Sequence, residues 1–337
     1  MSLQLLPPSS GRAGRRFDGV LPMNTAFRTG DILVAGNGLY FATLRADGTF
    51  AVFRGIDDND PAALLWSSGR PGETGPYFAI VQSDGNFCVY RETGDEGSGF
   101  GWHWGSQMTA KGNAFYGTMQ EDGNFSVRKG QGPADSCGLI WATGATDRVE
   151  SIVEVLHIEY DLGNACVLRT SPSNVYNETV VNCDKDQKQH RLRGTISVTT
   201  TTAWNNDITA RYSADAHFRA PVPVVDGEAI ELTGAPTPFL PDAAFSASSS
   251  WHFDTPVDVA PNASLRSAVS VTYSTISVPY VLLAALRFES GARVVGPLKG
   301  SFRGTNPHGT RASFVPHDPL PDNARMFERR LQVRAGN

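Results

Sequence analysis

The 337-residue chain is poor in charge and has no long apolar run. Charged side chains make up 19% of it, with a formal net charge of −5 at pH 7 and a pI near 5.8. Nucleic-acid-binding proteins instead carry a basic surface, so we expect no nucleic-acid partner. The one basic cluster, Arg12, Arg15 and Arg16, lies in a Pro-, Ser- and Gly-rich start and is predicted to be part of a solvated tail.

Membrane-spanning and secretory segments are also missing. No stretch approaches the roughly 18 apolar residues of a membrane-spanning helix. The first 30 residues lack the continuous apolar core of a signal peptide. We therefore expect a protein made in soluble form without a signal peptide, which would reach target cell membranes only after non-classical release or secretion.

Cysteine is scarce, and the motifs of common enzymes are not found. Cys88, Cys137, Cys166 and Cys183 form neither a disulfide framework nor a CxxC pair for zinc. Cys166 and Cys183 could pair across a hairpin, but reduced thiols are the favoured interpretation. The histidines show no HExxH spacing, and no nucleophile elbow or phosphate-binding loop is present. We expect no enzymatic activity, no metal and no cofactor.

What the sequence does contain is an internal repeat. The related segments are RADGTFAVF at 45–53, QSDGNFCVY at 82–90 and QEDGNFSVR at 120–128. Their aspartates recur at intervals of 37 and 38 residues, and one tryptophan follows each at a similar interval. These residues are Asp47, Asp84 and Asp122, and Trp66, Trp104 and Trp141.

Strands at this spacing, separated by Asp-Gly turns, predict an all-β unit. No single copy could bury its own apolar face, so the copies are expected to associate. The sequence therefore predicts a pseudo-threefold prism from about Asn24 to Asp147, with the three indoles meeting near its axis. Residues 1–23 are expected to form the tail.

The middle copy, QSDGNFCVY, has a polar residue at almost every second position. In an extended strand these positions share one face. Burial would leave their hydrogen-bonding groups unsatisfied, so the face is expected to look outward at a polar ligand. The residues are Gln82, Asp84, Asn86, Cys88 and Tyr90.

These residues resemble the Gln-x-Asp-x-Asn-x-Val-x-Tyr signature of the bulb-type, or monocot mannose-binding, lectin family, and the resemblance covers about the first 147 residues. It implies a β-prism II fold of three four-stranded sheets, in which each intact motif binds mannose without a metal ion. Amide and carboxylate groups would bond sugar hydroxyls. The side chain at the valine position, here Cys88, would be a small apolar contact.

The three copies are unequal. The first keeps only Asp47, with Arg45 and Thr49 in place of the two amides, and is expected to be vestigial. The third has Ser126 and Arg128 in place of the packing residue and the tyrosine, which predicts a weaker site. An alternative is that the Asp-Gly-Asn turns merely hold hairpins together. The candidate carbohydrate-binding residues are Gln82, Asp84, Asn86, Cys88, Tyr90, Gln120, Asp122 and Asn124.

After Asp147 the repeat stops and long Ser- and Thr-rich segments begin, for example at 194–204, 245–253 and 265–280. Such segments favour an elongated, largely solvated β-sheet, so residues 148–337 are expected to form a second all-β domain. Its end, from Pro321, is predicted to form a short helix with Phe327 and Leu331 on one side.

Within this half, the segment at 208–222 alternates strictly between apolar and polar residues. The alternation exceeds the roughly 9–11 residues that a tilted transmembrane strand needs. A lone hairpin would leave backbone groups unsatisfied in lipid, whereas several copies could close a barrel. An ordinary half-buried strand shows the same period. The apolar positions are Ile208, Ala210, Tyr212, Ala214, Ala216, Phe218, Ala220 and Val222.

This half resembles the aerolysin-like pore-forming family, and its natterin-like branch in particular. The matching pieces include VLHIEYD at 155–161, PVPVVDGEAIEL at 221–232 and SVPY at 277–280. The resemblance implies soluble protomers that assemble into a homo-oligomeric ring. Each protomer would then release an amphipathic hairpin into the target membrane lipid.

In such a hairpin, Asn206 to Ala220 would descend, Pro221 to Gly227 would form the tip, and Glu228 to about Thr233 would begin the return. The sequence departs from the family pattern at Pro236, Pro238 and Pro241, because proline is poorly tolerated in paired strands. Either these prolines lie outside the barrel or the chain does not insert.

Together the two resemblances predict a cytolytic or defence protein that binds mannose-type glycans on a target membrane and perforates it. The alternative is a non-lytic mannose-binding agglutinin whose second domain is an oligomerising stalk.

Overall fold

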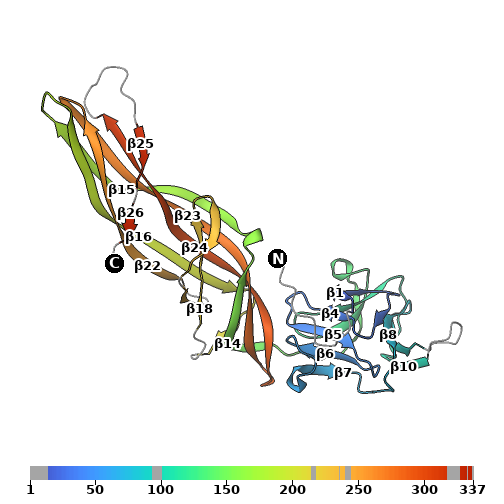
Figure 1. Ribbon diagram of the computed structural model, residues 1–337. Helices are drawn as coiled ribbons and strands as arrows, with labels where there is room; N and C mark the ends of the chain where they lie inside the picture. The colour runs from blue at the N-terminus through green and yellow to red at the C-terminus, as the bar shows by residue number, and fades with distance from the viewer. Residues whose placement is uncertain are drawn as a thin grey trace.

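The computed structural model describes residues 14–92, 101–213, 218–234, 236–239, 244–316, 327–331 and 333–335. Within these ranges the chain forms β-strands and three short 3-10 helices, and none of its helices is long and apolar enough to span a bilayer. Three sheets form a prism, and a longer twisted sheet extends away from it (Figure 1). The predicted all-β fold class is confirmed. The 3-10 helices are η1 (Pro61–Ala63), η2 (Pro133–Asp135) and η3 (Leu162–Asn164).

The prism has one sheet for each repeat. The strand orders are β1-β4-β5-β6-β7, β3-β8-β9-β10 and β2-β11-β12-β13, so the start of the chain adds a strand to every sheet. The bounds are β1 Arg16–Asp18, β2 Val20–Pro22, β3 Phe27–Arg28, β4 Ile32–Val34, β5 Tyr40–Leu44, β6 Phe50–Arg54, β7 Leu64–Ser67, β8 Tyr77–Val81, β9 Phe87–Arg91, β10 Gly101–Gly105, β11 Phe115–Met119, β12 Phe125–Lys129 and β13 Gly138–Ala142.

Aromatic rings from the three copies meet at the centre of the prism. The indole centroids of Trp66, Trp104 and Trp141 lie 5.7–6.0 Å apart, as the repeat predicts. Beside them pack three fully buried phenylalanines, which follow the Asp-Gly turn in each copy. Each buried ring contributes about 1.5–3 kcal/mol relative to an exposed one. The phenylalanines are Phe50, Phe87 and Phe125.

The expected tail is wrong for the part of it that the structure describes. β1 runs parallel to β4, β2 pairs with β11, and Leu21 is fully buried. Pairing with neighbouring strands, and not local sequence preference, orders these short segments. Their composition therefore did not indicate that they form strands.

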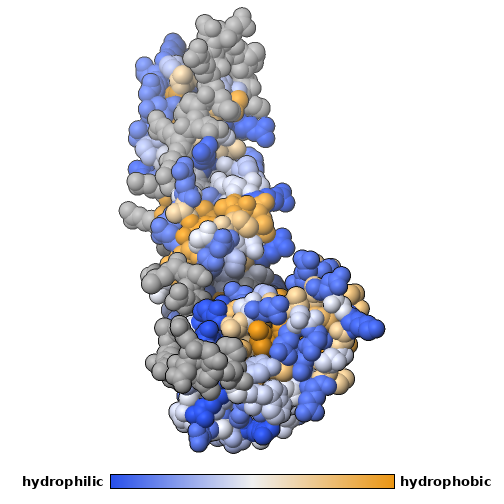
Figure 2. Space-filling model, turned by 90° about the vertical axis from the view of Figure 1, so that its right-hand side faces the viewer, coloured by the Kyte–Doolittle hydropathy of each residue, from blue (hydrophilic) through white to orange (hydrophobic). Residues whose placement is uncertain are grey.

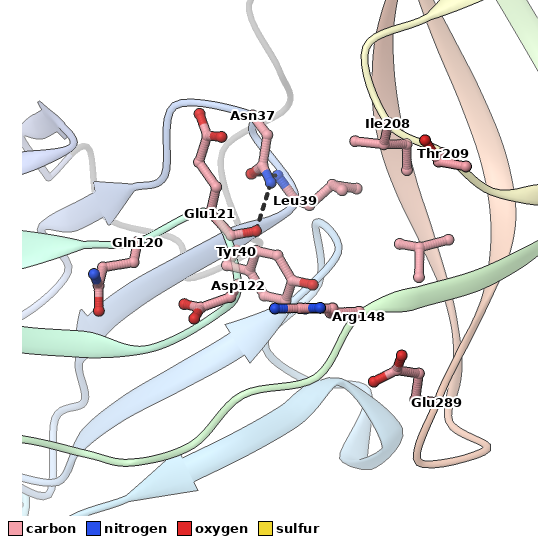
Figure 3. Close-up of a pocket in the computed structure, with 11 residues that line it drawn as sticks. Asn37, Leu39, Tyr40, Gln120, Glu121, Asp122, Arg148, Ile208, Thr209 and Glu289 are labelled. Carbon is pink, nitrogen blue, oxygen red and sulfur yellow. Dashed lines mark hydrogen bonds between the residues drawn. The ribbon is translucent and has the colours of Figure 1, made fainter.

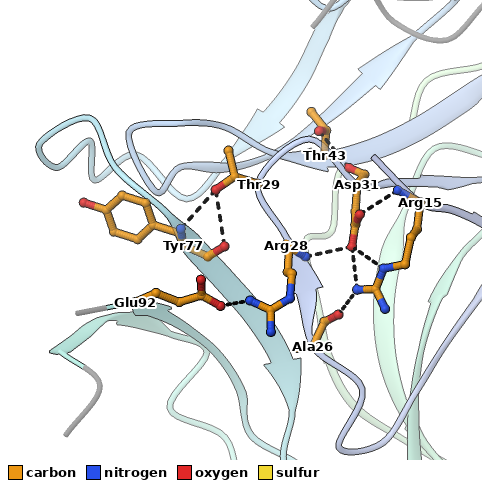
Figure 4. Close-up of polar contacts among 8 residues, drawn as sticks. All are labelled: Arg15, Ala26, Arg28, Thr29, Asp31, Thr43, Tyr77 and Glu92. Carbon is orange, nitrogen blue, oxygen red and sulfur yellow. Dashed lines mark hydrogen bonds and ion pairs between the residues drawn. The ribbon is translucent and has the colours of Figure 1, made fainter. Parts of the chain in front are cut away.

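Asp31 holds this start of the chain in place (Figure 4). Its carboxylate accepts from the backbone N–H groups of Arg15 and Arg28 and pairs with the Arg15 guanidinium at 2.7 Å. The guanidinium also donates to the carbonyl of Ala26, and Thr43 donates to the carbonyl of Asp31. The Asp31 side chain is only 4% exposed, so it depends on these partners.

Among the described residues of the second half there is one nine-stranded sheet and there are two small two-stranded sheets, β18 with β21 and β19 with β20. The long sheet has the order β17-β14-β23-β24-β16-β22-β26, with β15 added on β23 and β25 on β24. The bounds are β14 Val149–Tyr160, β15 Cys166–Asn182, β16 Lys188–Asn206, β17 Arg211–Tyr212, β18 Arg219–Ala220, β19 Pro223–Asp226, β20 Ala229–Leu232, β21 Thr237–Pro238, β22 Phe245–Val259, β23 Ala263–Phe288, β24 Arg293–Pro316, β25 Phe327–Arg330 and β26 Val333–Ala335.

The long strands bury one face and leave the other to solvent. In β16, Ile196 and Val198 are buried, whereas Thr195, Ser197 and Thr199 are exposed. The predicted elongated, Ser- and Thr-rich sheet is therefore present, and much of the surface seen in Figure 2 is hydrophilic. One apolar cluster joins the prism to the near end of the sheet, and a separate cluster fills its far end.

The structure decides between the two alternatives for the cysteines and overturns one local expectation. All four cysteines are free, and Cys166 begins β15 whereas Cys183 follows its last residue. A strand of 17 residues separates them by roughly 50 Å, far beyond the 7 Å limit for a disulfide. The predicted carboxy-terminal helix is replaced by β25 and β26, because residues 327–330 pair with Arg311–Phe314 of β24.

Candidate carbohydrate-binding sites and the predicted membrane segment

The middle motif lies at the hairpin between β8 and β9, and not along one strand as expected. Gln82, Asp84 and Asn86 are in the turn, and Cys88 and Tyr90 are in β9. The turn is closed by Gln82 N–H donating to the Asn86 carbonyl at 2.8 Å and by Asn86 N–H donating to Asp84 Oδ1 at 3.0 Å. Gly85 adopts φ +83°, which favours glycine. A turn therefore brings the five side chains together.

The amide of Gln82 is fixed from both sides. Its Nε2 donates to Tyr90 Oη at 2.9 Å, and Cys88 Sγ donates to its Oε1 at 3.3 Å. Burial raises the pKa of the Cys88 thiol, and burial followed by the nearby Cys88 raises the pKa of the Tyr90 phenol. Both groups therefore keep their protons near neutral pH. The Tyr90 hydroxyl accepts from Gln82 and keeps its own proton as a donor.

Cys88 lies beneath the site. It is only 1% exposed, and the predicted apolar contact with a sugar is replaced by a thiol that orients Gln82.

The remaining motif groups complement adjacent hydroxyls. Asn86 Oδ1 accepts from Ser106 at 2.9 Å, and its amide N–H groups have no acceptor among the described residues. Asp84 is exposed and uses one carboxylate oxygen to close the turn. Two donors, Tyr90 and Asn86, and one acceptor, Asp84, are thus available at one surface.

The third motif satisfies its own polar groups. Asn124 Nδ2 donates to Gln120 Oε1 at 3.0 Å, and Asn124 Oδ1 accepts from Thr143 at 2.9 Å. Arg128 donates to Ser126 at 3.3 Å in place of the missing phenol. Fewer groups are left for a ligand than in the middle motif.

The third motif also faces the second half of the chain. Gln120 and Asp122 line a pocket of about 680 Å³ whose other lining residues include Ile208 and Thr209 (Figure 3). Glu121 lies between them, and its carbonyl accepts from Asn37 at 2.8 Å. A ligand at this junction would meet the start of the predicted membrane segment.

The first motif lacks the groups of the middle one. Asp47 still closes its turn by accepting from Thr49 N–H at 2.9 Å. Arg45 lies over the Phe53 ring at 4.9 Å and donates to the Asp58 carbonyl. A cation and a phenyl ring therefore occupy the places of the amide and the phenol.

In this structure the predicted membrane segment is not one continuous strand but forms short strands with different partners. β17 pairs with β14, β18 with β21, and β19 with β20. Ala214 and Ala216 lie outside the described residues. The alternation shows that one face is apolar, but it does not specify what covers that face.

The apolar side chains of this segment are packed inward. Ala220 and Val222 are buried, and Ile208, Ala210, Tyr212 and Phe218 pack against the same cluster. Phe239 lies among the covering rings, with its centroid 5.2 Å from that of Trp204, 6.2 Å from Tyr212 and Phe218, and 6.5 Å from Tyr280.

The segment leaves and rejoins the long sheet at one place. β16 and β22, which flank it, are antiparallel partners up to the pair Thr202 and Phe245. The predicted tip holds β19, and the turn follows at Gly227, with φ +62°. Pro238 pairs with Arg219 at the edge of a two-stranded sheet, which suits proline, and Pro241 lies outside the described residues.

Asn306 of β24 holds the hairpin of β19 and β20 against the long sheet. Its Oδ1 accepts from Val225 N–H, and its Nδ2 donates to the Val225 carbonyl, both at 2.9 Å. Asn306 is 7% exposed. Two residues along β24, His308 bonds Ser274 at 2.7 Å, and burial lowers the pKa of its imidazole.

Sequence reasoning missed Asn306 and Trp102. No pattern marks Asn306. Trp102 lies directly opposite Tyr90, and its place two residues before Trp104 could have shown that both belong to one strand. In the ranges that the structure describes, no cluster of three His, Cys, Asp or Glu side chains is arranged as a metal site.

No family model and no curated protein matches the chain. Solved structures do. A monomeric monocot mannose-binding lectin from Gastrodia elata is 23% identical, with 38% of this chain and 98% of the lectin covered and a TM-score of 0.30. The lamprey immune protein is 14% identical, with 90% and 96% covered and a TM-score of 0.39. The aerolysin-like protein of Bombina maxima is 9% identical, with 48% and 98% covered and a TM-score of 0.34. Lectins and aerolysin-like proteins are the two groups that the sequence resembles.

Proposed function

We propose that this protein is a lectin-targeted pore-forming protein. The prism, residues 24–147 with the strands that precede them, binds mannose-type glycans on a target membrane. Residues 148–337 then oligomerise and insert the segment at 208–222. The observation that best supports the proposal is the place of this segment in the fold. Its apolar face is covered, and it lies in the chain between β16 and β22, which are already paired with each other.

The pairing of β16 with β22 supports a continuous hairpin. Thr202 pairs with Phe245, so continuing this register pairs even-numbered residues of the outgoing arm with odd-numbered residues of the return. Directly paired residues share a face. The apolar positions from Ile208 to Val222 would therefore share a face with Ala229, Ala235 and Phe239. The polar residues of the return arm on that face are Glu231, Thr233 and Thr237.

Covering the apolar face explains how such a segment stays in solution. In the described residues, Phe239 and Trp204 shield it, and Asn306 satisfies the backbone of Val225. In lipid, the backbone groups would need partners from neighbouring copies, which only a closed barrel supplies. The proposal therefore requires several copies of the chain in a ring.

Targeting depends chiefly on the middle motif, because it offers free donors and an acceptor. A single sugar site of this kind binds weakly, and a ring of copies on a glycan-rich surface gains avidity. The protein would act at target cell membranes after non-classical release or secretion, with glycan and membrane lipid as its partners and without enzymatic activity.

The experiment is dye release from liposomes with and without a mannose-bearing glycolipid. Wild type should release dye only from the glycan-bearing vesicles. Asp84→Asn should reduce release several-fold, and the matched change in the third motif, Asp122→Asn, should have a smaller effect. Clumping of vesicles without leakage would contradict the pore and support a non-lytic lectin.

A further inference from the structure

Trp102 is an exposed aromatic side chain directly beside the middle motif. It belongs to β10 and pairs with Tyr90 of β9. Paired residues in antiparallel strands project from the same face with their Cβ atoms about 4.5–5.5 Å apart. The indole is 49% exposed, whereas the three axial tryptophans pack together in the prism. Trp102 therefore extends the surface that Tyr90 begins.

The indole also borders the floor of the site. A Cβ placed on Gly105 would lie 3.1 Å from Cys88 Sγ and 3.4 Å from Trp102 Nε1. The buried thiol that orients Gln82 and the indole N–H thus flank the same glycine. A side chain at Gly105 would intrude between them.

Arg70 holds the indole from the neighbouring repeat. Its guanidinium lies 5.4 Å from the centroid of the Trp102 ring, within the range of a cation–π contact. The Arg70 carbonyl lies 2.7 Å from His103 Nε2, which ties this loop to β10. The aromatic surface is held by its strand on one side and by a cation from the loop between β7 and β8.

The other two copies show that the prism does not need a tryptophan here. Leu64 pairs with Phe53 in the first copy, and Leu139 pairs with Arg128 in the third. Both leucines are exposed, at 40% and 58%. Only the copy that keeps both amides, the aspartate and the tyrosine carries an aromatic ring at this position.

We propose that Trp102, positioned by Arg70, forms a second sugar subsite beside the middle motif. An oligosaccharide would place one ring against Asp84, Asn86 and Tyr90 and stack the next ring on the indole. The C–H face of a pyranose packs well on an aromatic face, and the indole N–H can donate to a hydroxyl. This inference rests on the proposed sugar binding of the middle motif.

Calorimetric titration with methyl α-mannoside and with an α-linked mannotriose tests the subsite. The variant Trp102→Leu carries the residue that both other copies have, so the fold should be kept. Wild type should bind the trisaccharide about tenfold more tightly than the monosaccharide, which corresponds to about 1.4 kcal/mol. Trp102→Leu should lose this preference while its affinity for the monosaccharide changes less than twofold, and Trp102→Phe should keep part of it.

Three results would overturn the subsite. One is a trisaccharide preference that persists in Trp102→Leu, and another is an equal loss for both ligands. The third is binding of wild type, but not of Trp102→Leu, to glycan-free phosphatidylcholine vesicles, which would make the indole a lipid contact. If neither sugar binds wild type, the proposed sugar binding itself fails, and that result is distinct from a lost preference.

Discussion

At the scale of single residues, the middle motif works because its amide is oriented before a ligand arrives. Gln82 is held between the Cys88 thiol and the Tyr90 phenol. The sequence predicts which residues gather, because the spacing of the motif is preserved. It does not predict that Cys88 is buried and bonded, because a thiol can be an apolar contact or a donor with equal ease.

Removing the Tyr90 hydroxyl tests this arrangement. In Tyr90→Phe, Gln82 loses an acceptor and a ligand loses a donor, so affinity for methyl α-mannoside should fall by roughly 2–10-fold, as for one neutral hydrogen bond. Calorimetry measures the change. Tyr176→Phe in β15 is the control and should leave affinity unchanged, because that hydroxyl bonds Glu178 in the second half of the chain. An unaltered affinity in Tyr90→Phe would contradict the role of the phenol.

At the scale of elements, periodicity predicts strands better than it predicts their partners. The repeat predicts the prism and its axial indoles, because identical units must bury their apolar faces against one another. The segment at 208–222 has the alternation of a strand, yet its described residues form only the short strands β17 and β18, because Phe239 and neighbouring rings cover its apolar face equally well. Residues 327–330 pair with β24, and this contact overrides their helical spacing.

Asn306 should control how readily the β19–β20 hairpin detaches. Asn306→Ala leaves the buried N–H and C=O of Val225 without these partners, which costs about 1–3 kcal/mol for each unsatisfied group. Hydrogen exchange at residues 223–232 should therefore be at least tenfold faster than in wild type, and exchange in the prism should not change. Asn177→Ala, on the exposed face of β15, is the control. Unchanged exchange at Val225 in Asn306→Ala would contradict the fastening.

His308 should make the packed form sensitive to acid. Its pKa is lowered, chiefly by burial, while the charge of Asp226 partly opposes this. In a form whose β19–β20 hairpin has detached, the exposed imidazole binds a proton more readily than in the packed form. The packed form is therefore most stable above pH 6.5, the ordinary pKa of histidine, and becomes less stable as the pH falls below that value. Dye release should be a few-fold faster at pH 5.5 than at pH 7.5. In His308→Gln the two rates should be similar, and an undiminished pH effect there would exclude His308 as its source.

At the scale of the whole molecule, one buried carboxylate joins the prism to the long sheet. Asp147 pairs with Arg54 at 2.7 Å and accepts from the backbone and the hydroxyl of Ser290. Its carbonyl accepts from Tyr40, and the Arg54 guanidinium lies over Phe288. These contacts cross the expected boundary, which a change of composition marks in the sequence without showing how the two parts are joined.

Breaking this junction should destabilise the protein strongly. Asp147→Ala leaves Arg54 buried without its partner, and the free energy of unfolding should fall by about 3–5 kcal/mol. Glu150→Gln removes an exposed pair with Arg287 and should change it by less than about 1 kcal/mol. Urea unfolding followed by tryptophan fluorescence measures both. Equal effects would contradict the importance of the buried pair.

The most direct test of the central claim is dye release by a protein in which the segment at 208–222 is locked to the long sheet by a disulfide. Ser151 and Arg211 are paired across β14 and β17, so their Cα atoms are within reach of a disulfide. Oxidised Ser151→Cys/Arg211→Cys should bind mannose-bearing liposomes as wild type does and release no dye, and a reductant should restore release. The single-cysteine variants should behave as wild type. Full release by the oxidised double variant would contradict the claim that this segment forms the pore.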